Sequence, residues 1–435
     1  MTDSEIQSYL HFGAAYRPLA EQGSHALANI HEPGLREWIA SASRSALIAE
    51  GVRRLRASAE AALEAAEPGS HAIQLSGGYD SRAILGALLN HLSPSEVVAC
   101  TFGTPGAPDY ELPARMAASV GVAIERLDIQ TLRWDLDAVV AYARNAFRRH
   151  PAALALERYV NYQLRCRIGT APTYWVGYLG DALAGAHLPQ TPSESWEAAA
   201  QRFVATNRRT RSILLTRPGW SPTSVLPDAP LMPHDVLGFD DQLDLAGRQA
   251  AYIDIPWAPF RDTYLFDQRE WKAFALALPW EERVGPPHRR LPLYLDVLAE
   301  AFPRLSRFPV QGNRPRPIPF SPVQAFFQRA GRAARRVGRA LSVVPRTPDV
   351  MRMDYAADLR ADTPHARLVR QLVADSDARG RLPHLDGRAL WEAHARNEAD
   401  YARELMVLAS LEVNLKAGEN HQRIRRSQVR ELASA

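Results

Sequence analysis

Short apolar runs alternate with helical patterns between residues 71 and 176, and this alternation restricts the fold more than any other feature of the chain. The strand-like segments cover residues 71–75, 96–102, 123–129 and 173–176; the first is a short apolar run, and each has the length of a strand. Strands that alternate with helices form a parallel sheet covered by helices on both faces. We therefore predict an α/β fold whose functional site lies at the carboxyl ends of the strands.

The rest of the chain divides around this core. We predict a short helical segment over residues 1–70, the α/β core over 71–190, and an insertion with a mostly helical C-terminal part over 191–435. Residues 189–233 are rich in Pro, Ser and Thr and should have little regular structure. Residues 388–415 carry one long helical pattern.

The composition describes a globular protein. Hydrophobic residues make up 46% of the 435 residues and charged residues 23%, which is enough apolar material for a large core. The two cysteines, Cys100 and Cys166, exclude a disulfide framework, and we expect Cys100 to pack in a buried strand. The chain has no long uninterrupted apolar stretch and no signal-peptide pattern at its start. We expect a cytoplasmic protein without a membrane partner.

The positive charge of the chain is almost wholly arginine. Of the 52 basic residues only Lys272 and Lys416 are lysines, so 50 are arginines. Such a bias is typical of a GC-rich genome, and the net charge of +4 is weak support for nucleic-acid binding. The sequence predicts that Lys272 is a solvated surface charge on a helix. A mechanism that needs a catalytic lysine has two candidates.

A glycine-rich turn, Ser-Gly-Gly-Tyr-Asp-Ser at residues 76–81, lies between the first predicted strand and the helix after it. Two glycines let a backbone approach an anion closely, and the free N–H groups of a helix start favour a phosphate. Asp80 would repel that phosphate unless a cation lay between them, so it suggests a magnesium ligand. The alternative is a plain turn in which Asp80 or a serine caps the helix.

A second glycine-rich turn follows the fourth predicted strand, at residues 177–185, and its acidic residue Asp181 comes 101 positions after Asp80. In a parallel sheet both turns can lie at the same edge. Asp80 and Asp181 could then share one metal ion, while the glycines admit nucleotide and acyl groups. Two such turns are hard to explain as helix caps.

This pair of turns resembles the signature of the asparagine synthetase family, whose synthetase domain is a PP-loop ATP pyrophosphatase of the adenine nucleotide alpha hydrolase type. The resemblance covers about residues 50 to 310 and continues through residues 109–111, 259–262 and 275–279. It implies ATP and Mg²⁺ as cofactors, and an enzyme that adenylates a carboxylate, releases pyrophosphate and lets an amine attack the acyl adenylate. The residues that it implies for ATP binding are Ser76, Gly77, Gly78, Asp80, Ser81, Thr101, Gly103 and Gly180, with Asp80 and Asp181 as metal ligands.

The chain departs from the family at its start. Glutamine-hydrolysing members begin with a cysteine nucleophile, whereas Met1 is followed here by Thr2. We therefore expect no glutaminase activity, and an amine that comes from solution or from the substrate itself.

Tyr178 in the second turn resembles the β-lactam synthetase branch, where a tyrosine and a glutamate deprotonate an amine of the same molecule. The resemblance implies a catalytic role for Tyr178 and a ring-forming, natural-product type of reaction like that of β-lactam synthetases or lasso peptide cyclases. Glu270, Glu281 and Glu282 are candidate partners of the phenol. The alternative is an aromatic residue that lines the pocket or packs in the core.

A lysine that family members place near the reacting phosphate has no counterpart in residues 302–316. Arg307 or Arg314 could replace it, although a guanidinium is a planar fork and not a compact point charge. This departure motivates another hypothesis, a catalytically degenerate fold that binds a peptide or protein through the arginine-rich segment 326–341. That segment is otherwise a solvated helix face.

A third hypothesis, an RNA-modifying PP-loop enzyme, is disfavoured because such enzymes usually need paired reactive cysteines, which Cys100 and Cys166 do not provide. Two histidines, His150 and His187, are isolated in the sequence and are interpreted as structural. The leading hypothesis remains an ATP-dependent carbon–nitrogen ligase that acts on a small-molecule or peptide carboxylate.

Overall fold

A five-stranded sheet forms the centre of the protein in a computed structural model that describes residues 1–16, 27–28, 30–146, 151, 153–253, 259–287, 289–309 and 353–434. All neighbouring strands pair in parallel, in the order β3-β2-β1-β4-β5. The α/β class is therefore confirmed. The strands are β1 (His71–Gln74), β2 (Val97–Gly103), β3 (Ala123–Asp128), β4 (Thr173–Val176) and β5 (Arg261–Tyr264).

The sequence analysis found the first four strands and missed β5. Its residues, Arg-Asp-Thr-Tyr, contain no apolar run, and all four are only half-buried. Asp262 in this strand pairs with Arg165, so the strand is held by ladder pairing with β4 and by an ion pair and not by an apolar face. The sheet consequently extends beyond the segment 71–190.

The strand order reverses between β1 and β4. The chain runs from β1 through β2 to β3 on one side, and then crosses to β4 and β5 on the other side of β1. In open parallel sheets a ligand site forms beyond the carboxyl ends of the strands at such a point. The two glycine-rich turns directly follow β1 and β4 and therefore both lie there.

The sheet separates two apolar cores, because alternate residues of each strand point to opposite faces. Ile73, Ala99 and Trp175 belong to one core, while Ala72, Cys100 and Tyr174 belong to the other. Cys100 is 1% exposed and packs in β2 as predicted. The first core includes helices α4 (Arg44–Glu64), α5 (Tyr79–Leu89), α6 (Pro108–Ser119), α14 (Arg269–Ala277), α16 (Pro292–Ala301) and α17 (Pro303–Ser306).

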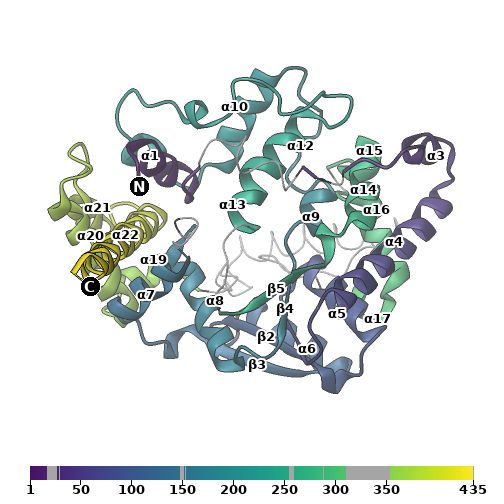
Figure 1. The fold of residues 1–435 in the computed structure, drawn as a ribbon, viewed down its shortest axis with the longest axis horizontal. Coiled ribbons are helices and arrows are strands. Elements are labelled where there is room, and N and C mark those ends of the chain that lie inside the picture. The colour runs from purple at the N-terminus through teal and green to yellow at the C-terminus, as the bar shows by residue number, and fades with distance from the viewer. Residues whose placement is uncertain are drawn as a thin grey trace, which may run out of the picture.

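The second core joins the start of the chain to its end. Helix α1 packs against α22, and the buried Tyr9 hydroxyl accepts a hydrogen bond from Asn414 Nδ2 at 3.1 Å. Figure 1 shows the C-terminal helices gathered beside α7 and α8. This core includes helices α1 (Asp3–Phe12), α7 (Leu136–Ala146), α8 (Ala155–Ile168), α10 (Trp196–Asn207), α20 (Pro364–Arg379) and α22 (Ala402–Ser434).

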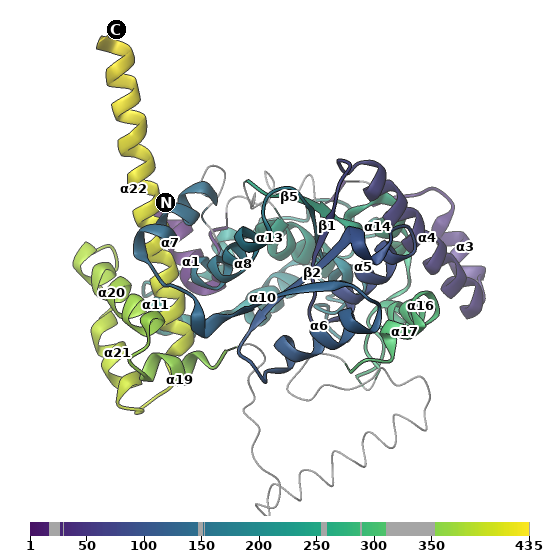
Figure 2. The same ribbon diagram turned by 90° about the horizontal axis from the view of Figure 1, so that it is seen from below.

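Two regions differ from the sequence expectation. Residues 189–233 contain the twelve-residue helix α10, whose first turn is capped because Ser195 Oγ accepts the Ala198 N–H at 3.2 Å. The long pattern at 388–415 is two helices, since Asn397 takes a left-handed backbone with φ of 59° between α21 (Gly387–Ala395) and α22. Figure 2 shows the last part of α22 standing out from the body of the molecule.

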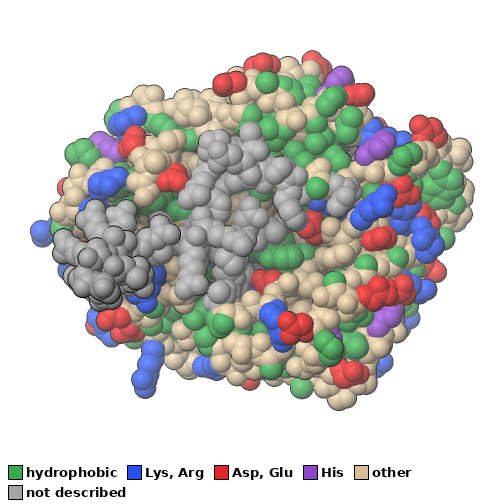
Figure 3. Space-filling view, viewed as in Figure 1, with side chains coloured by type: hydrophobic (Ala, Val, Ile, Leu, Met, Phe, Trp, Pro, Cys, Tyr) green, Lys and Arg blue, Asp and Glu red, His purple; other side chains and the backbone are tan. Residues whose placement is uncertain are grey.

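Shorter elements connect these helices: α3 (Leu35–Ser41), α9 (Gly180–Leu183), α11 (Ser212–Leu215), α12 (Phe239–Leu243), the π-helix η4 (Asp244–Gln249), α13 (Ala250–Ile253), α15 (Trp280–Arg283) and α19 (Tyr355–Arg360). None of the helices within the described residues combines the length and apolar character needed to span a bilayer. On the face seen in Figure 3, basic and acidic side chains intermingle. The arginine-rich segment 326–341 lies outside the described residues.

Candidate active site

A cavity of about 630 Å³ lies beyond the carboxyl ends of β1 and β4, and we call it the main cavity. Its size is typical of small-molecule sites. Both glycine-rich turns line it, and further walls come from α8 and from the π-helix η4. The lining residues from these four segments are Ser76, Gly78, Tyr79, Asp80, Ser81, Gly177, Tyr178, Leu179, Asp181, Glu157, Arg158, Asn161, Arg165, Arg248 and Gln249.

Two serine hydroxyl groups hold the first turn in shape. Ser81 Oγ accepts the Ser76 N–H at 3.0 Å, and Ser76 Oγ accepts the Gly78 N–H at 3.1 Å. Helix α5 begins after Gly78 without a side-chain cap, so no side chain satisfies the backbone N–H groups of its first turn. Because such groups and the helix dipole favour an anion, the turn has the chemistry of a phosphate site.

Arg82, a residue that the sequence analysis did not single out, lies behind this turn. It is 1% exposed, and it donates to the carbonyl groups of Gly77 at 2.9 Å and Gly78 at 3.0 Å. Since the carbonyl and N–H of a trans peptide point in opposite directions, this grip turns the following N–H groups away from Arg82. Burial lowers the pKa of Arg82 to about 10, so the guanidinium stays charged at neutral pH and favours an anion at the turn.

The second turn is built around Asp80 of the first. A β-carbon added at Gly180 would come within 2.5 Å of the Asp80 carboxyl carbon, and one added at Gly177 would lie 3.2 Å from the Asp80 β-carbon. These glycines therefore let the two turns touch, where we had expected them to admit a ligand. Leu179 between them takes a left-handed φ of 74°, a strained backbone of the kind found at functional sites.

Asp80 and Asp181 are brought together by this contact. The Asp181 backbone N–H and the Tyr294 hydroxyl both donate to the Asp80 carboxylate, the latter at 2.7 Å. Burial, and next the negative charge of Asp181, raise the pKa of Asp80 well above its usual value. The carboxylates of Asp80 and Asp181, which lie close together and are partly shielded from solvent, thus repel each other in the protein without ligand.

The carboxylate pair fits a divalent cation that arrives with a phosphate. Neither Asp80 nor Asp181 forms an ion pair within the described residues, and a cation between them would remove their repulsion. Mg²⁺ commonly uses one or two carboxylates and completes its octahedron with phosphate oxygens and water. No cluster of three or more His, Cys, Asp or Glu suited to a metal occurs among the residues described.

Tyr178 lines the main cavity with a different partner from those expected. Its hydroxyl oxygen accepts a hydrogen bond from Arg158 Nη2 at 3.1 Å. None of the predicted glutamates lines the cavity, and Glu282 pairs instead with Arg44. The carboxylates that do line it are Asp80, Asp181 and Glu157. The structure thus gives Tyr178 an arginine partner, and Glu270, Glu281 and Glu282 lie in α14 and α15 and do not line the cavity.

His187, which the sequence presented as isolated, belongs to a polar cluster in the cavity wall. Its Nδ1 lies 3.3 Å from Asp244 Oδ2 and 3.1 Å from Gln249 Nε2, and that amide reaches the same carboxylate oxygen at 3.3 Å. Asp244 and Gln249 are the first and last residues of η4, and a π-helix brings residues five apart onto one side. The ring nitrogen Nδ1 thus faces Asp244, and Nε2 is the nitrogen that Asp244 does not engage.

Four residues predicted to bind the nucleotide do not line the main cavity. Gly77 is buried behind the turn with its carbonyl on Arg82, and Gly180 contacts Asp80. The Thr101 hydroxyl donates to the Asp109 carbonyl at 2.9 Å, which ties β2 to α6, and Gly103 is paired inside the sheet with Asp128. The predictions of ligand contact at these residues are not supported by their positions.

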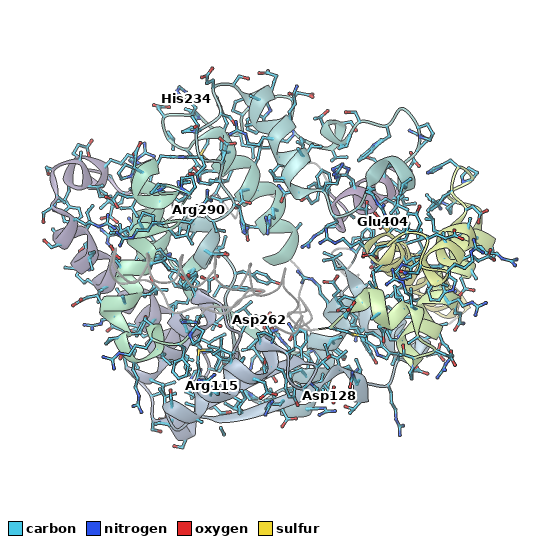
Figure 4. All side chains as sticks on the ribbon, turned by 180° about the vertical axis from the view of Figure 1, so that it is seen from behind. Arg115, Asp128, His234, Asp262, Arg290 and Glu404 are labelled. Atoms are coloured by element: carbon cyan, nitrogen blue, oxygen red, sulfur yellow. The ribbon has the colours of Figure 1, made fainter. Side chains whose placement is uncertain are left out.

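Arginines supply the positive charge of the cavity. Arg158, Arg165, Arg209 and Arg248 line it, whereas Arg307 is exposed and does not, and Arg314 lies outside the described residues. Arg165 is held by Asp262, which Figure 4 places near the centre of the molecule. Lys272 is 2% exposed and pairs with Asp267 at 2.9 Å, so its prediction as a solvated charge is wrong. His150 lies outside the described residues.

No protein-family model matches the chain, and no curated protein shows significant similarity to it.

Proposed function

We propose that the protein is an ATP-dependent, magnesium-requiring ligase that activates a carboxylate as an acyl adenylate and joins it to an amine. The observation that carries the proposal is the contact between two turns 101 residues apart, which brings Asp80 and Asp181 together in one cavity beside an uncapped helix start. The resemblance of both turns to the PP-loop synthetases of the asparagine synthetase family supports the same reading.

In the first step a carboxylate oxygen of the substrate attacks the α-phosphorus of ATP, and the bond to pyrophosphate breaks. The first turn, with Arg82 behind it, would hold the pyrophosphate, whose negative charge grows as it leaves. Mg²⁺ held by Asp80 and Asp181 would neutralise part of that charge. The arginines of the cavity fit the other phosphate oxygens, since their planar groups bind such oxygens in pairs.

In the second step the amine nitrogen attacks the acyl carbon, AMP leaves with the bonding electron pair, and the nitrogen loses a proton. His187 is suited to accept that proton, because the residue lines the cavity and Asp244 faces its Nδ1, which leaves Nε2 not engaged by Asp244. Tyr178 would hold a substrate group near Arg158. The lysine that family members use has no counterpart in residues 302–316. This departure does not by itself favour a non-catalytic binding protein, because the four arginines that line the cavity supply positive charge.

The experiment that tests the proposal measures pyrophosphate release from ATP and Mg²⁺ with a panel of carboxylic acids. At least one acid should stimulate release by the wild-type protein, and Asp80→Ala or Asp181→Ala should abolish it. Asp362→Ala is a matched control, because Asp362 is a carboxylate 84% exposed that does not line the cavity. If no acid raises pyrophosphate release above the Asp80→Ala background, the proposed function is wrong.

A further inference from the structure

We propose that the substrate carries a second carboxylate, and that a smaller cavity next to the main cavity binds it. This inference rests on the proposed function and names the class of acid that the site takes: a dicarboxylic acid or an acidic peptide.

The smaller cavity has a volume of about 250 Å³ and adjoins the main one. Leu154, Glu157, Arg209 and Arg248 line both cavities, so a single molecule can extend from one into the other. Helices α1, α8 and α22, the end of α10 and the π-helix η4 all contribute to its walls.

The charge of this smaller cavity is strongly positive. Four arginines line it, Arg208, Arg209, Arg248 and Arg403, against the single carboxylate of Glu157. Among the described residues no carboxylate lies within 4.0 Å of the guanidinium of Arg208, Arg248 or Arg403.

Several arginines that enter the interior elsewhere in the fold have such partners, whereas Arg82 is held by backbone carbonyl groups. The guanidinium groups of Arg54, Arg165, Arg283 and Arg379 each pair with a carboxylate of the protein. Arg248 is half-buried, and its guanidinium donates a hydrogen bond to the neutral Asn207 side chain at 3.4 Å. A guanidinium partly removed from water, such as that of Arg248, is stabilised by an opposite charge. Arg208 and Arg403 are exposed and add positive charge at the rim, so together these arginines fit an anion supplied by the ligand.

The remaining walls indicate what joins the anion to the rest of the ligand. Phe12 and Tyr16 stack with ring centroids 4.5 Å apart, and Met406 and Val407 add aliphatic surface. Such walls fit methylene groups better than a strongly hydrated group. A carboxylate on a short aliphatic stem, as in glutarate or a glutamate side chain, satisfies both the arginines and these walls, and we choose it over a phosphate for that reason.

The test compares acids that differ only in the second carboxylate. Pyrophosphate release is measured with glutarate, adipate and pimelate, and with pentanoate, hexanoate and heptanoate, in which a methyl group replaces one carboxylate. We expect kcat/KM for the best diacid to exceed that of its monoacid by about tenfold or more, the effect of one charged hydrogen-bonded pair. Arg403→Gln and Arg208→Gln should reduce this ratio toward one. Arg367→Gln, a change of an exposed arginine that pairs with Asp362, should leave the ratio as it is.

The outcomes separate the two proposals. Pyrophosphate release with monoacids as fast as with diacids overturns the second-carboxylate proposal and leaves the ligase intact, whereas no release with any acid overturns both. A phosphate-bearing acid such as O-phosphoserine that reacts faster than every diacid would overturn the choice of carboxylate. Calorimetric titration of tri-glutamate in the presence of a non-hydrolysable ATP analogue gives a readout without turnover. Its binding should weaken about tenfold in the double variant Arg208→Gln, Arg403→Gln.

Discussion

Gly180 lies against the carboxyl group of Asp80, so that a β-carbon at Gly180 would meet both the carboxyl carbon and Oδ1 at 2.5 Å. The same added atom would also come within 2.8 Å of the Phe266 ring. The missing side chain at Gly180 is thus what allows the turn after β4 to reach the turn after β1. The position of the carboxylate pair depends on this contact.

A Gly180→Ala variant should consequently lose activity and stability together. The extra methyl group must push Asp80 or Phe266 away, and overpacking of this kind costs about 1–3 kcal/mol of the free energy of unfolding. Urea unfolding and pyrophosphate release would measure the two effects. Gly238→Ala is the control, because a β-carbon there meets its nearest neighbour, Asp241 Oδ2, at an ordinary 3.5 Å. Wild-type stability and activity in Gly180→Ala would mean that the contact is not needed.

Asp80→Asn should make the protein without ligand more stable while it removes activity. The pKa of Asp80 is raised by burial and by Asp181, which means that holding Asp80 ionised costs stability at neutral pH. An amide of the same shape can still accept the Tyr294 hydrogen bond but carries no charge. Thermal unfolding should show a higher Tm for the variant without Mg²⁺. Added ATP and Mg²⁺ should raise the Tm of the wild type only. A lower Tm without ligand would contradict the repulsion.

The parts of the fold that were predicted correctly have local causes. The strands β1, β2 and β4 are short and mostly apolar, β3 alternates apolar and charged residues, and the turn at 76–81 is recognisable from its glycines. The same logic placed both turns at one edge of the sheet, because parallel strands end on the same side. What the structure adds there is the contact itself between Gly180 and Asp80.

The parts that were missed depend on partners distant in the sequence. β5 is polar and exists because it pairs with β4, and Lys272 is buried because Asp267 lies beside it. His187 meets Asp244 across 57 residues, through a π-helix whose extra residue per turn has no sequence pattern of its own. Tyr178 likewise found an arginine on α8 where a glutamate had been expected. Short-range periodicity carries no information on these pairings.

Low pH should destabilise the fold at the contact between β1 and β4, because His71 lies there. This buried ring accepts the Trp175 indole N–H at Nδ1, at 3.0 Å, and burial lowers the pKa of His71 although Glu96 opposes the shift. A histidine with a lowered pKa in the folded state binds fewer protons than in the unfolded state. The stability that it contributes is therefore present above about pH 6.5 and is lost as the pH falls below that value.

The measurement is the free energy of unfolding between pH 5 and 8 in wild type and His71→Gln. The slope of the wild type should exceed that of the variant by at most about 1.4 kcal/mol per pH unit, the contribution of one proton. His11 and His394 also have a pKa lowered by burial, so both proteins keep some slope of the same sign. Identical slopes would show that His71 takes up its proton equally in both states.

His187→Gln should slow the attack of the amine far more than the formation of the adenylate. Loss of a general base typically costs about 10²–10⁴-fold in the step that needs it, whereas adenylation requires no proton transfer from the carboxylate. Adenylation is measured by trapping the acyl adenylate with hydroxylamine, and amide formation is measured by product analysis with a weaker nucleophile such as ammonia.

Asp244→Asn should give an intermediate loss, because it removes the carboxylate that faces Nδ1. His384→Gln is the control, since that ring binds the Leu215 carbonyl and does not line the main cavity. Equal losses of both steps in His187→Gln would mean that His187 shapes the cavity and does not move the proton.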